Sequence, residues 1–334
     1  MLRNLRNAFP LLVLAVPALA QGVTLRLDPV ADATANADQP AVNYGTSAEL
    51  NFGKDFASTP SFRTWFTRGH VRFDLSGVGQ PTPPARATFF WYQTRANAAG
   101  CLDVALHRLT QTWAEATVTW NSKPTHDATV VSRACVGNSF ELGWKTFDVT
   151  ALVAGWMTNQ YPNYGFVIRD PSESTAGAAR PGYGASRENP NAAIRPYLLL
   201  EWVYPYGTGC GPNATKPTLE LALGTPRLGQ PFTLKGALLA PAAPSLFLMG
   251  ESRTQWGAIR LPYDLGAIGF AGCQLQTAIA LSLGLGSDPA GSVIVNLLVP
   301  NDPGLLGDDY FVQLANLGAG AQLFMTPGLG FRVY

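Results

Sequence analysis

Charge is scarce in this chain. Only 13% of its 334 residues are Asp, Glu, Lys or Arg, whereas ordinary soluble domains have about 25%. This scarcity excludes a disordered polyampholyte, and the lack of long Ala/Glu/Lys/Leu runs excludes a coiled coil. The chain has only three histidines and four cysteines, and neither type shows a paired metal-ligand spacing. Zinc chemistry is therefore not expected.

Turn-forming residues are abundant instead. The chain has 34 glycines and 26 prolines, and hydrophobic residues make up 47% of it. Frequent Gly and Pro divide the chain into segments that are too short for many helices, while the hydrophobic content is sufficient for sizeable cores. The sequence therefore predicts an all-β fold.

The N-terminus has the features of a secretory signal peptide. Arg3 and Arg6 precede an apolar run over residues 8–19, and small residues at 18 and 20 precede Gln21. The run is shorter than the roughly 20 residues that span a bilayer. Residues 1–20 are predicted to be removed, an uncleaved anchor being the alternative. The product is expected to be secreted, without a membrane span.

The mature chain has almost no net charge. Without Arg3 and Arg6 it contains 21 cationic and 22 anionic side chains. General attraction to nucleic acid or anionic lipid is therefore not expected.

The four cysteines all lie in the exported part of the chain, at positions 101, 135, 210 and 273. An even number in an oxidising compartment favours disulfides. Four cysteines allow three pairings. We favour Cys101 with Cys135 and Cys210 with Cys273, because a predicted domain boundary separates the two pairs.

Composition changes near residue 206. Upstream, residues 21–205 carry 15 cationic and 15 anionic side chains and seven of the eight tryptophans, whereas the remainder carries 6 and 7, with Trp256 alone. Residues 204–209 (YPYGTG) are typical of a linker. We predict a first domain over residues 21–206 and an accessory domain over residues 207–334.

The sequence patterns of both halves predict short strands. The pattern Val71-Arg72-Phe73-Asp74-Leu75 alternates as a half-buried strand does. One helix is expected, with Thr150 as its N-cap and an apolar stripe up to Trp156. Many strands separated by turns predict a β-sandwich in each half. Expected strands cover residues 23–27, 71–75, 87–93, 102–109, 146–149, 164–169, 195–204, 217–223, 231–238, 245–249, 274–283, 292–299, 310–314 and 330–334.

Several segments of the first half carry a family resemblance. Residues 113–121 (WAEATVTWN) are the most specific of them. The others, in order, are residues 31–34 (ADAT), 43–45 (NYG), 72–76 (RFDLS), 85–87 (ARA), 147–150 (FDVT), 165–166 (GF), 186–188 (SRE) and 195–198 (RPYL). Together, over about residues 23–204, they resemble the DNRLRE domain family, also classed as family 96 carbohydrate-binding modules.

This resemblance implies a jelly-roll-like sandwich that binds polysaccharide, including acidic polymers such as alginate, and does not itself catalyse. The cysteine pair and the scarcity of lysine depart from the family pattern. The second half resembles a C-terminal domain of certain secreted bacterial proteins, for which the resemblance implies no activity.

Candidate sugar-binding residues concentrate in residues 63–72. In strand alternation Arg68, His70 and Arg72 point the same way. A row of cations beside aromatic rings suits an anionic sugar, because guanidinium groups grip carboxylates while an aromatic face covers the ring. The alternative is a solvated strand face that opposes acids on its neighbour. The full candidate set is Tyr44, Lys54, Arg63, Trp65, Arg68, His70, Arg72, Tyr183 and Arg187.

No cofactor is expected apart from a structural calcium ion. Asp28, Asp32 and Asp38 surround a loop, and Glu188 has few basic neighbours, so hard oxygen ligands could converge. Asp28, Asp32 and Glu188 are the predicted ligands, although the chain has no calcium-loop pattern of alternating Asp residues.

The sequence as a whole predicts a secreted, non-catalytic protein that binds an acidic polysaccharide. One alternative is a structural or adhesive surface protein with sandwich spacers and partners among other secreted or surface proteins. Another is a polysaccharide lyase with His70 as base and Tyr44 as acid, although no catalytic motif supports it.

Overall fold

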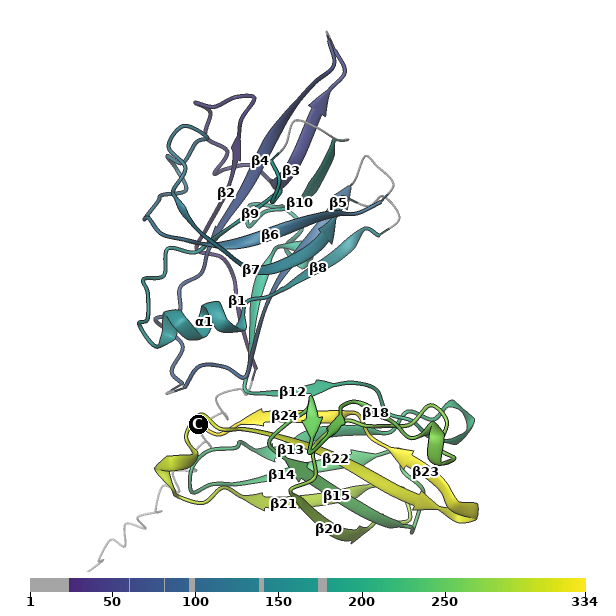
Figure 1. Ribbon diagram of the computed structural model, residues 1–334. Helices are drawn as coiled ribbons and strands as arrows, with labels where there is room; N and C mark the ends of the chain where they lie inside the picture. The colour runs from purple at the N-terminus through teal and green to yellow at the C-terminus, as the bar shows by residue number, and fades with distance from the viewer. Residues whose placement is uncertain (1–23, 60, 81, 96–99, 138–140, 174–178) are drawn as a thin grey trace, which may run out of the picture.

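The computed structural model describes residues 24–334 apart from residues 60, 81, 96–99, 138–140 and 174–178. The predicted signal peptide lies outside the described residues. The described chain is an all-β sandwich protein with several antiparallel sheets and an α-helix, as the sequence predicts. Figure 1 shows two lobes, the first formed by the purple-to-teal part of the chain and the second by the green-to-yellow part.

The first lobe contains eleven strands and helix α1. They are β1 (Thr24–Leu27), β2 (Ala31–Asn36), β3 (Glu49–Ala57), β4 (Arg63–Arg72), β5 (Arg86–Arg95), β6 (Leu102–Leu109), β7 (His126–Val136), β8 (Gly143–Asp148), α1 (Thr150–Met157), β9 (Phe166–Arg169), β10 (Arg180–Ala185) and β11 (Tyr197–Glu201). All eleven strands belong to one hydrogen-bonded network in the order β1-β11-β5-β10-β3-β4-β9-β6-β7, where β2 pairs with β4 and β8 with β5.

This network folds over a main core, and a smaller apolar cluster lies around Trp113 and Val167. Burial alternates along strand β5, so that Phe89 and Trp91 are fully buried. Phe89 meets Phe166 of β9, with ring centroids 5.0 Å apart and an edge-to-face angle of 64°. Strands β5 and β9 therefore face each other across the core, and the alternate residues of each strand face outward.

Helix α1 differs from the sequence prediction at its start. Its N-cap residue is Val149, which makes no capping hydrogen bond through its side chain. Thr150, the predicted cap, instead accepts a hydrogen bond through Oγ1 from the backbone N–H of Ala87, at 3.0 Å. The hydroxyl therefore ties the helix to β5, and the buried side chains of Leu152, Val153 and Trp156 complete the attachment.

The second lobe contains the remaining strands. They are β12 (Val203–Tyr206), β13 (Thr218–Gly224), β14 (Pro231–Ala237), β15 (Pro244–Gly250), β16 (Gln255–Trp256), β17 (Ile259–Arg260), β18 (Tyr263–Asp264), β19 (Gln274–Leu275), β20 (Leu281–Gly286), β21 (Val293–Leu298), β22 (Asp309–Gly318), β23 (Gln322–Met325) and β24 (Gly328–Arg332). Strands β12-β24-β22-β15-β20 form one sheet, with β23 on β22, and β13-β14-β21 form another. Short 3-10 turns link several strands. The side chains of Leu234, Phe247, Val312 and Leu314 are central to the core between these sheets.

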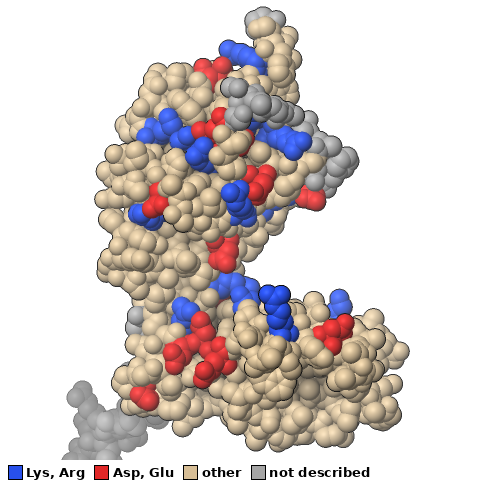
Figure 2. All heavy atoms as spheres, in the orientation of Figure 1, with Lys and Arg blue, Asp and Glu red and all other residues tan. Residues whose placement is uncertain are grey.

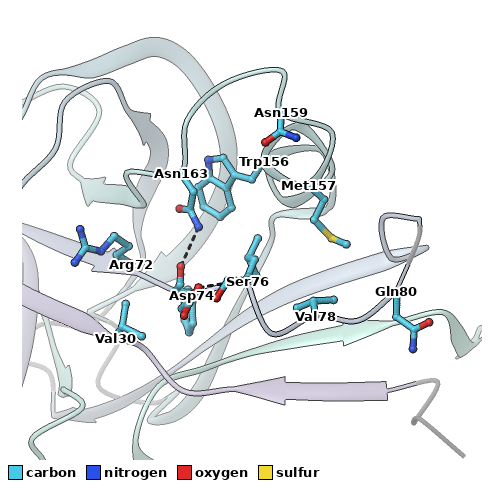
Figure 3. Close-up of a pocket in the computed structure, with 12 residues that line it drawn as sticks. Val30, Arg72, Asp74, Ser76, Val78, Gln80, Trp156, Met157, Asn159 and Asn163 are labelled. Atoms are coloured by element: carbon cyan, nitrogen blue, oxygen red, sulfur yellow. Dashed lines mark hydrogen bonds between the residues drawn. The ribbon is translucent and has the colours of Figure 1, made fainter.

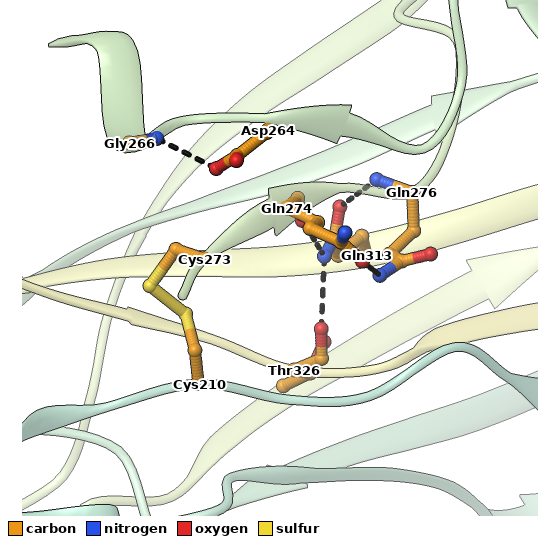
Figure 4. Close-up of a disulfide and its surroundings, with 8 residues drawn as sticks. All are labelled: Cys210, Asp264, Gly266, Cys273, Gln274, Gln276, Gln313 and Thr326. Carbon is orange, nitrogen blue, oxygen red and sulfur yellow. Dashed lines mark hydrogen bonds between the residues drawn. A yellow bond between two sulfur atoms is a disulfide. The ribbon is translucent and has the colours of Figure 1, made fainter. Parts of the chain in front are cut away.

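The cysteines pair as expected, Cys101 with Cys135 and Cys210 with Cys273. Figure 4 shows the second disulfide beside a network of buried amides. In this network Gln313 donates hydrogen bonds through Nε2 to the carbonyls of Gln274 and Thr326, at 3.0 and 2.8 Å. By closing loops of 34 and 63 residues, the disulfides stabilise the fold by about 4 kcal/mol each in the chain-entropy model.

The strand pairing changes from one lobe to the other at Trp202. Glu201 ends β11 in the first network, and Val203 begins β12, which pairs with β24 in the second. The predicted domain boundary near residue 206 stays a prediction. The lobes touch each other through Arg332, whose Nη1 donates to the carbonyl of Pro84 at 2.9 Å.

Candidate functional site

The predicted row of cations on β4 is not an open surface. Arg68, His70 and Arg72 do share the face opposite the buried Val71, as the alternation predicts. However, the segment from Trp113 to Trp120 covers this face. Its Trp113 lies 5.8 Å from the His70 ring and accepts a hydrogen bond from Arg72 at its carbonyl, at 3.3 Å. His70 is therefore buried, whereas Arg68 and Arg72 are half-buried. Sugar binding by this row stays a prediction.

His70 is enclosed by this packing. Only 1% of the residue is exposed. Burial, and then the positive charge of Arg68, lower the pKa of His70 to about 3. A neutral, enclosed imidazole does not reach a polymer, so the lyase alternative, which used His70 as base, gains no support from this geometry.

Arg68 belongs to a different arrangement. Its guanidinium binds Glu173 through two hydrogen bonds of 2.6 Å. Arg169 of β9 contacts the same carboxylate, with Nε 3.1 Å from Oε1. Arg68 and Lys123 both lie over the Trp120 ring, at 5.2 and 4.1 Å from its centroid. We call the group the cationic cluster; its members are Arg68, Lys123, His126, Arg169 and Glu173.

The cationic cluster has an excess of positive charge. Arg68, Lys123 and Arg169 surround one carboxylate, that of Glu173. Burial lowers the pKa of Lys123, and the nearby Arg68 lowers it further. Burial also lowers the pKa of His126 to about 4, with help from Arg68 and Arg169. Because Arg68, Lys123 and Arg169 repel one another, the cluster would attract an anionic group.

The cluster remains within reach of solvent. The side chains of Arg68 and Arg169 are 13% and 16% exposed, and Trp120, Lys123 and His126 are half-buried. Partial burial strengthens charge interactions relative to open water. A carboxylate or sulfate on a sugar therefore fits the chemistry of the cluster.

Two other predicted sugar contacts lie inside the protein. Lys54 on β3 is 3% exposed and Tyr183 on β10 is 5% exposed. Tyr183 donates a hydrogen bond to Asp55, while the Arg95 guanidinium lies 3.6 Å from its ring centroid. Neither Lys54 nor Tyr183 presents its side chain to a polymer, because tertiary packing encloses both.

Tyr44, Arg63 and Trp65 stay nearer the surface. Tyr44 donates a hydrogen bond from its hydroxyl to Gln39, at 2.7 Å. Arg63 pairs with Asp38 at 3.0 Å and lies 5.5 Å from the Trp65 ring centroid. The structure brings Arg63 and Trp65 together, and their role in sugar binding stays a prediction.

Arg187, a predicted sugar contact, pairs with acidic residues of the protein itself. Its Nη1 donates to Glu115 at 2.8 Å, and its backbone N–H donates to Asp32 at 2.8 Å. Carboxylate oxygens of Asp32, Glu115 and Glu188 all lie within 4.8 Å of one another. We call these three residues the acidic cluster. Sequence reasoning paired Asp32 with Glu188 but missed Glu115 as a third partner.

The acidic cluster could hold a hard cation such as calcium, since carboxylate oxygens are its preferred ligands. Asp28 does not join it: its side chain is exposed and lies 3.6 Å from Arg26. This part of the prediction is wrong, because the Asp28 side chain, just after the end of β1, is 77% exposed. Calcium binding itself stays a prediction.

Asp32→Asn is expected to raise the unfolding temperature at neutral pH in buffer that contains a chelator. Burial raises the pKa of Asp32 well above its usual value, and Glu188 and Glu115 add to this effect. The unfolded chain therefore ionises at a lower pH than the folded one, so stability falls as pH rises between the two values. Thermal unfolding from pH 4 to 7 measures the difference in unfolding temperature between Asp32→Asn and the natural chain. This difference should shrink toward pH 4. A variant that is less stable than the natural chain at pH 7 contradicts this expectation.

A cavity of about 680 Å³ lies between helix α1 and the loop after β4. Figure 3 shows Arg72 at one side of it and Trp156 at the other. Two of its polar side chains already have partners: Asp74 accepts from the Ser76 N–H at 2.9 Å, and Asn163 donates to a backbone carbonyl. The Nε1 of Trp156, by contrast, is buried without a hydrogen-bond partner among the described residues. With one cation and one carboxylate in its lining, the cavity has no excess positive charge and suits an acidic polymer less well than the cationic cluster.

The family model of carbohydrate-binding module family 96 matches residues 23–201. The match covers more than half of the chain, so the protein belongs to this family. Family membership assigns the protein a role in carbohydrate binding.

Other comparisons add little. No curated protein matches the chain significantly. The crystal structure of red sea bream transglutaminase is 11% identical, with a TM-score of 0.17 over 93% of this chain and 31% of the transglutaminase chain. The structure of the Macrobrachium rosenbergii nodavirus is 10% identical, with a TM-score of 0.16 over 99% of this chain and 97% of the other. TM-scores this low do not indicate a shared fold.

Proposed function

We propose that the protein is secreted and binds an acidic polysaccharide at the cationic cluster without cleaving it. The excess positive charge around Glu173 carries this proposal, because a sugar carboxylate would relieve the repulsion among Arg68, Lys123 and Arg169. The half-buried Trp120 ring lies beside these cations and helps to position Lys123, whose Nζ is 4.1 Å from the ring centroid.

Secretion is supported by two observations. The N-terminal sequence has the features of a signal peptide, and two disulfides form in the folded chain, as is typical of oxidising compartments. In the described part of the chain, none of the helices has the length and apolar character needed to cross a membrane.

Lys123→Gln is expected to weaken binding to alginate oligosaccharides by about tenfold, the typical loss for one charge-assisted hydrogen bond. Isothermal titration calorimetry with the full chain measures this loss. Lys216→Gln is the matched control, because it removes the same charge from an exposed site in the second lobe and should leave the affinity unchanged.

Binding should also weaken with added salt, because a partly exposed charge cluster is screened. Equal affinity of the natural chain and Lys123→Gln for every acidic polymer tested would reject the cationic cluster as the site. Modules of this kind are typically non-catalytic, so the polymers are expected to keep their length. Release of unsaturated or reducing ends by the purified chain would instead support an enzyme.

Adhesion is a second candidate function, favoured by the second lobe. Leu246, Leu281, Leu283 and Leu317 are exposed on strands β15, β20 and β22. Figure 2 shows that the lower right of this lobe carries few charged side chains. An uncharged apolar surface of this kind suits docking to another surface component. Co-purification of a specific protein partner without any glycan retention would select adhesion.

A further inference from the structure

An aromatic surface lies on the outer face of the first lobe, away from the cationic cluster. Strand β5 buries Phe89 and Trp91 and therefore turns Phe90 and Tyr92 outward. In the sheet register Tyr92 lies opposite Trp144 of β8, and Phe90 lies opposite Tyr197 of β11. We call these four residues, Phe90, Tyr92, Trp144 and Tyr197, the aromatic platform.

The rings of the aromatic platform hold one another in fixed orientations. Phe90 and Tyr197 stack face to face, with centroids 4.6 Å apart and planes within 9° of parallel. The Trp144 ring is nearly perpendicular to those of Tyr92 and Phe90, at 89° and 84°, and lies 5.2 Å from Tyr197. Trp144 is nevertheless 39% exposed. The largest ring is thus both fixed in place and open to solvent.

Polar groups surround the aromatic platform. The Arg26 guanidinium lies 3.9 Å from the Tyr197 ring centroid. Thr146, exposed on β8, lies opposite Phe90 in the register. Hydroxyl and guanidinium groups beside aromatic rings match the two sides of a sugar ring, whose C–H face is apolar and whose edge carries hydroxyl groups.

We propose that the aromatic platform is a second glycan-binding surface, on which the C–H faces of sugar rings stack against Trp144. This inference rests on the proposed function, since membership in a carbohydrate-binding family is what makes a glycan the occupant. A ring that is already fixed loses little conformational freedom when a sugar stacks on it, which favours binding. Because stacking does not depend on charge, this surface accepts neutral as well as acidic sugars.

The aromatic platform and the cationic cluster lie on opposite sides of the first lobe. Phe89 of β5 contacts Phe166 of β9 across the core, whereas Tyr92 of β5 and Arg169 of β9 face outward. One polymer chain could therefore occupy each side. Two sites on one module raise the overall affinity for a dense polysaccharide without any new contact.

Retention of the full chain on bead-immobilised neutral β-glucan, mannan, xylan and alginate, at low and high salt, tests the aromatic platform. Salt screens the cationic cluster but not stacking, so the natural chain is expected to keep a salt-resistant component on at least one of these polymers. Trp144→Ala should lower the affinity of that component by about tenfold, as expected for truncation of a central tryptophan.

The matched control is Trp256→Ala, because Trp256 is 37% exposed in the second lobe. It should bind like the natural chain. Trp144→Leu keeps apolar volume against the neighbouring rings and should lose binding as Trp144→Ala does, even if the alanine variant fails to fold.

The outcomes separate the two proposals. Salt-resistant retention by Trp144→Leu equal to that of the natural chain overturns the aromatic platform. The aromatic platform is also overturned if none of the polymers shows salt-resistant retention. In that case, salt-sensitive binding that depends on Lys123 would still support the proposed function. If retention depends on Trp144 and not on Lys123, the cationic cluster fails while the aromatic platform is supported.

Discussion

Trp202→Ala is expected to lower the free energy of unfolding by about 3–5 kcal/mol, the usual cost of truncating a buried tryptophan. Trp202 is fully buried at the point where the strand pairing passes from one lobe to the other. Its Nε1 donates to the carbonyl of Thr82 at 3.1 Å, and its ring lies 6.1 Å from Tyr334 of the second lobe. The substitution removes a large apolar side chain from the core of the first lobe and, with it, the contact to Tyr334.

Urea denaturation followed by circular dichroism measures this loss. Trp256→Ala serves as the control, because the exposed Trp256 side chain should contribute within about 0.5 kcal/mol. A loss below about 1 kcal/mol for Trp202→Ala would contradict the packing described here. Because Tyr334 belongs to the same core cluster as Trp202, we also expect the two lobes of the variant to unfold in separate steps.

Local patterns account for what the sequence could predict. The sequence predicts a strand over residues 87–93, and the structure has one over Arg86–Arg95. The composition change that separates the first two cysteines from the last two was enough to choose the correct disulfides. The segments that carry the family resemblance fall within the residues that the family model matches.

The candidate site depended on contacts that no local pattern contains. Alternation indicates that Arg68, His70 and Arg72 share a face, but it does not indicate whether another segment covers that face. Trp113 does so from 41 residues beyond Arg72. The partner of Arg68, Glu173, is 105 residues away. Such pairs arise from the tertiary fold, so the ion pair could not be predicted from the sequence.

The aromatic platform was missed for a different reason. Residues 89–92 (FFWY) form an unbroken aromatic run, which suggests a strand that is buried on both faces. The structure buries only Phe89 and Trp91. The useful signal would have been the combination of this run with the isolated Trp144, but only strand pairing places Trp144 opposite Tyr92.

Glu173→Gln is expected to destabilise the protein by about 2–3 kcal/mol at neutral pH, because a carboxylate in a partly buried, charge-assisted pair is replaced by a neutral group. Burial by itself would raise the pKa of Glu173, but the hydrogen bond from Arg68 and the charges of Arg68 and Arg169 outweigh it and hold the pKa below its usual value. The ionised carboxylate therefore stabilises the fold above pH 4.5, the ordinary pKa of the group, and this stabilisation is lost as the pH falls through the lower folded pKa.

The same variant tests the electrostatic basis of the proposed function. Without Glu173 the three cations have no carboxylate among them, so alginate oligosaccharides should raise the unfolding temperature of Glu173→Gln more than that of the natural chain. Glu141→Gln is the control, because it removes an exposed carboxylate that pairs only loosely with Lys145, at 3.6 Å, and should respond like the natural chain. An equal response of all three proteins would show that the cationic cluster does not take up the acidic sugar, since the added positive charge would then have no effect on its binding.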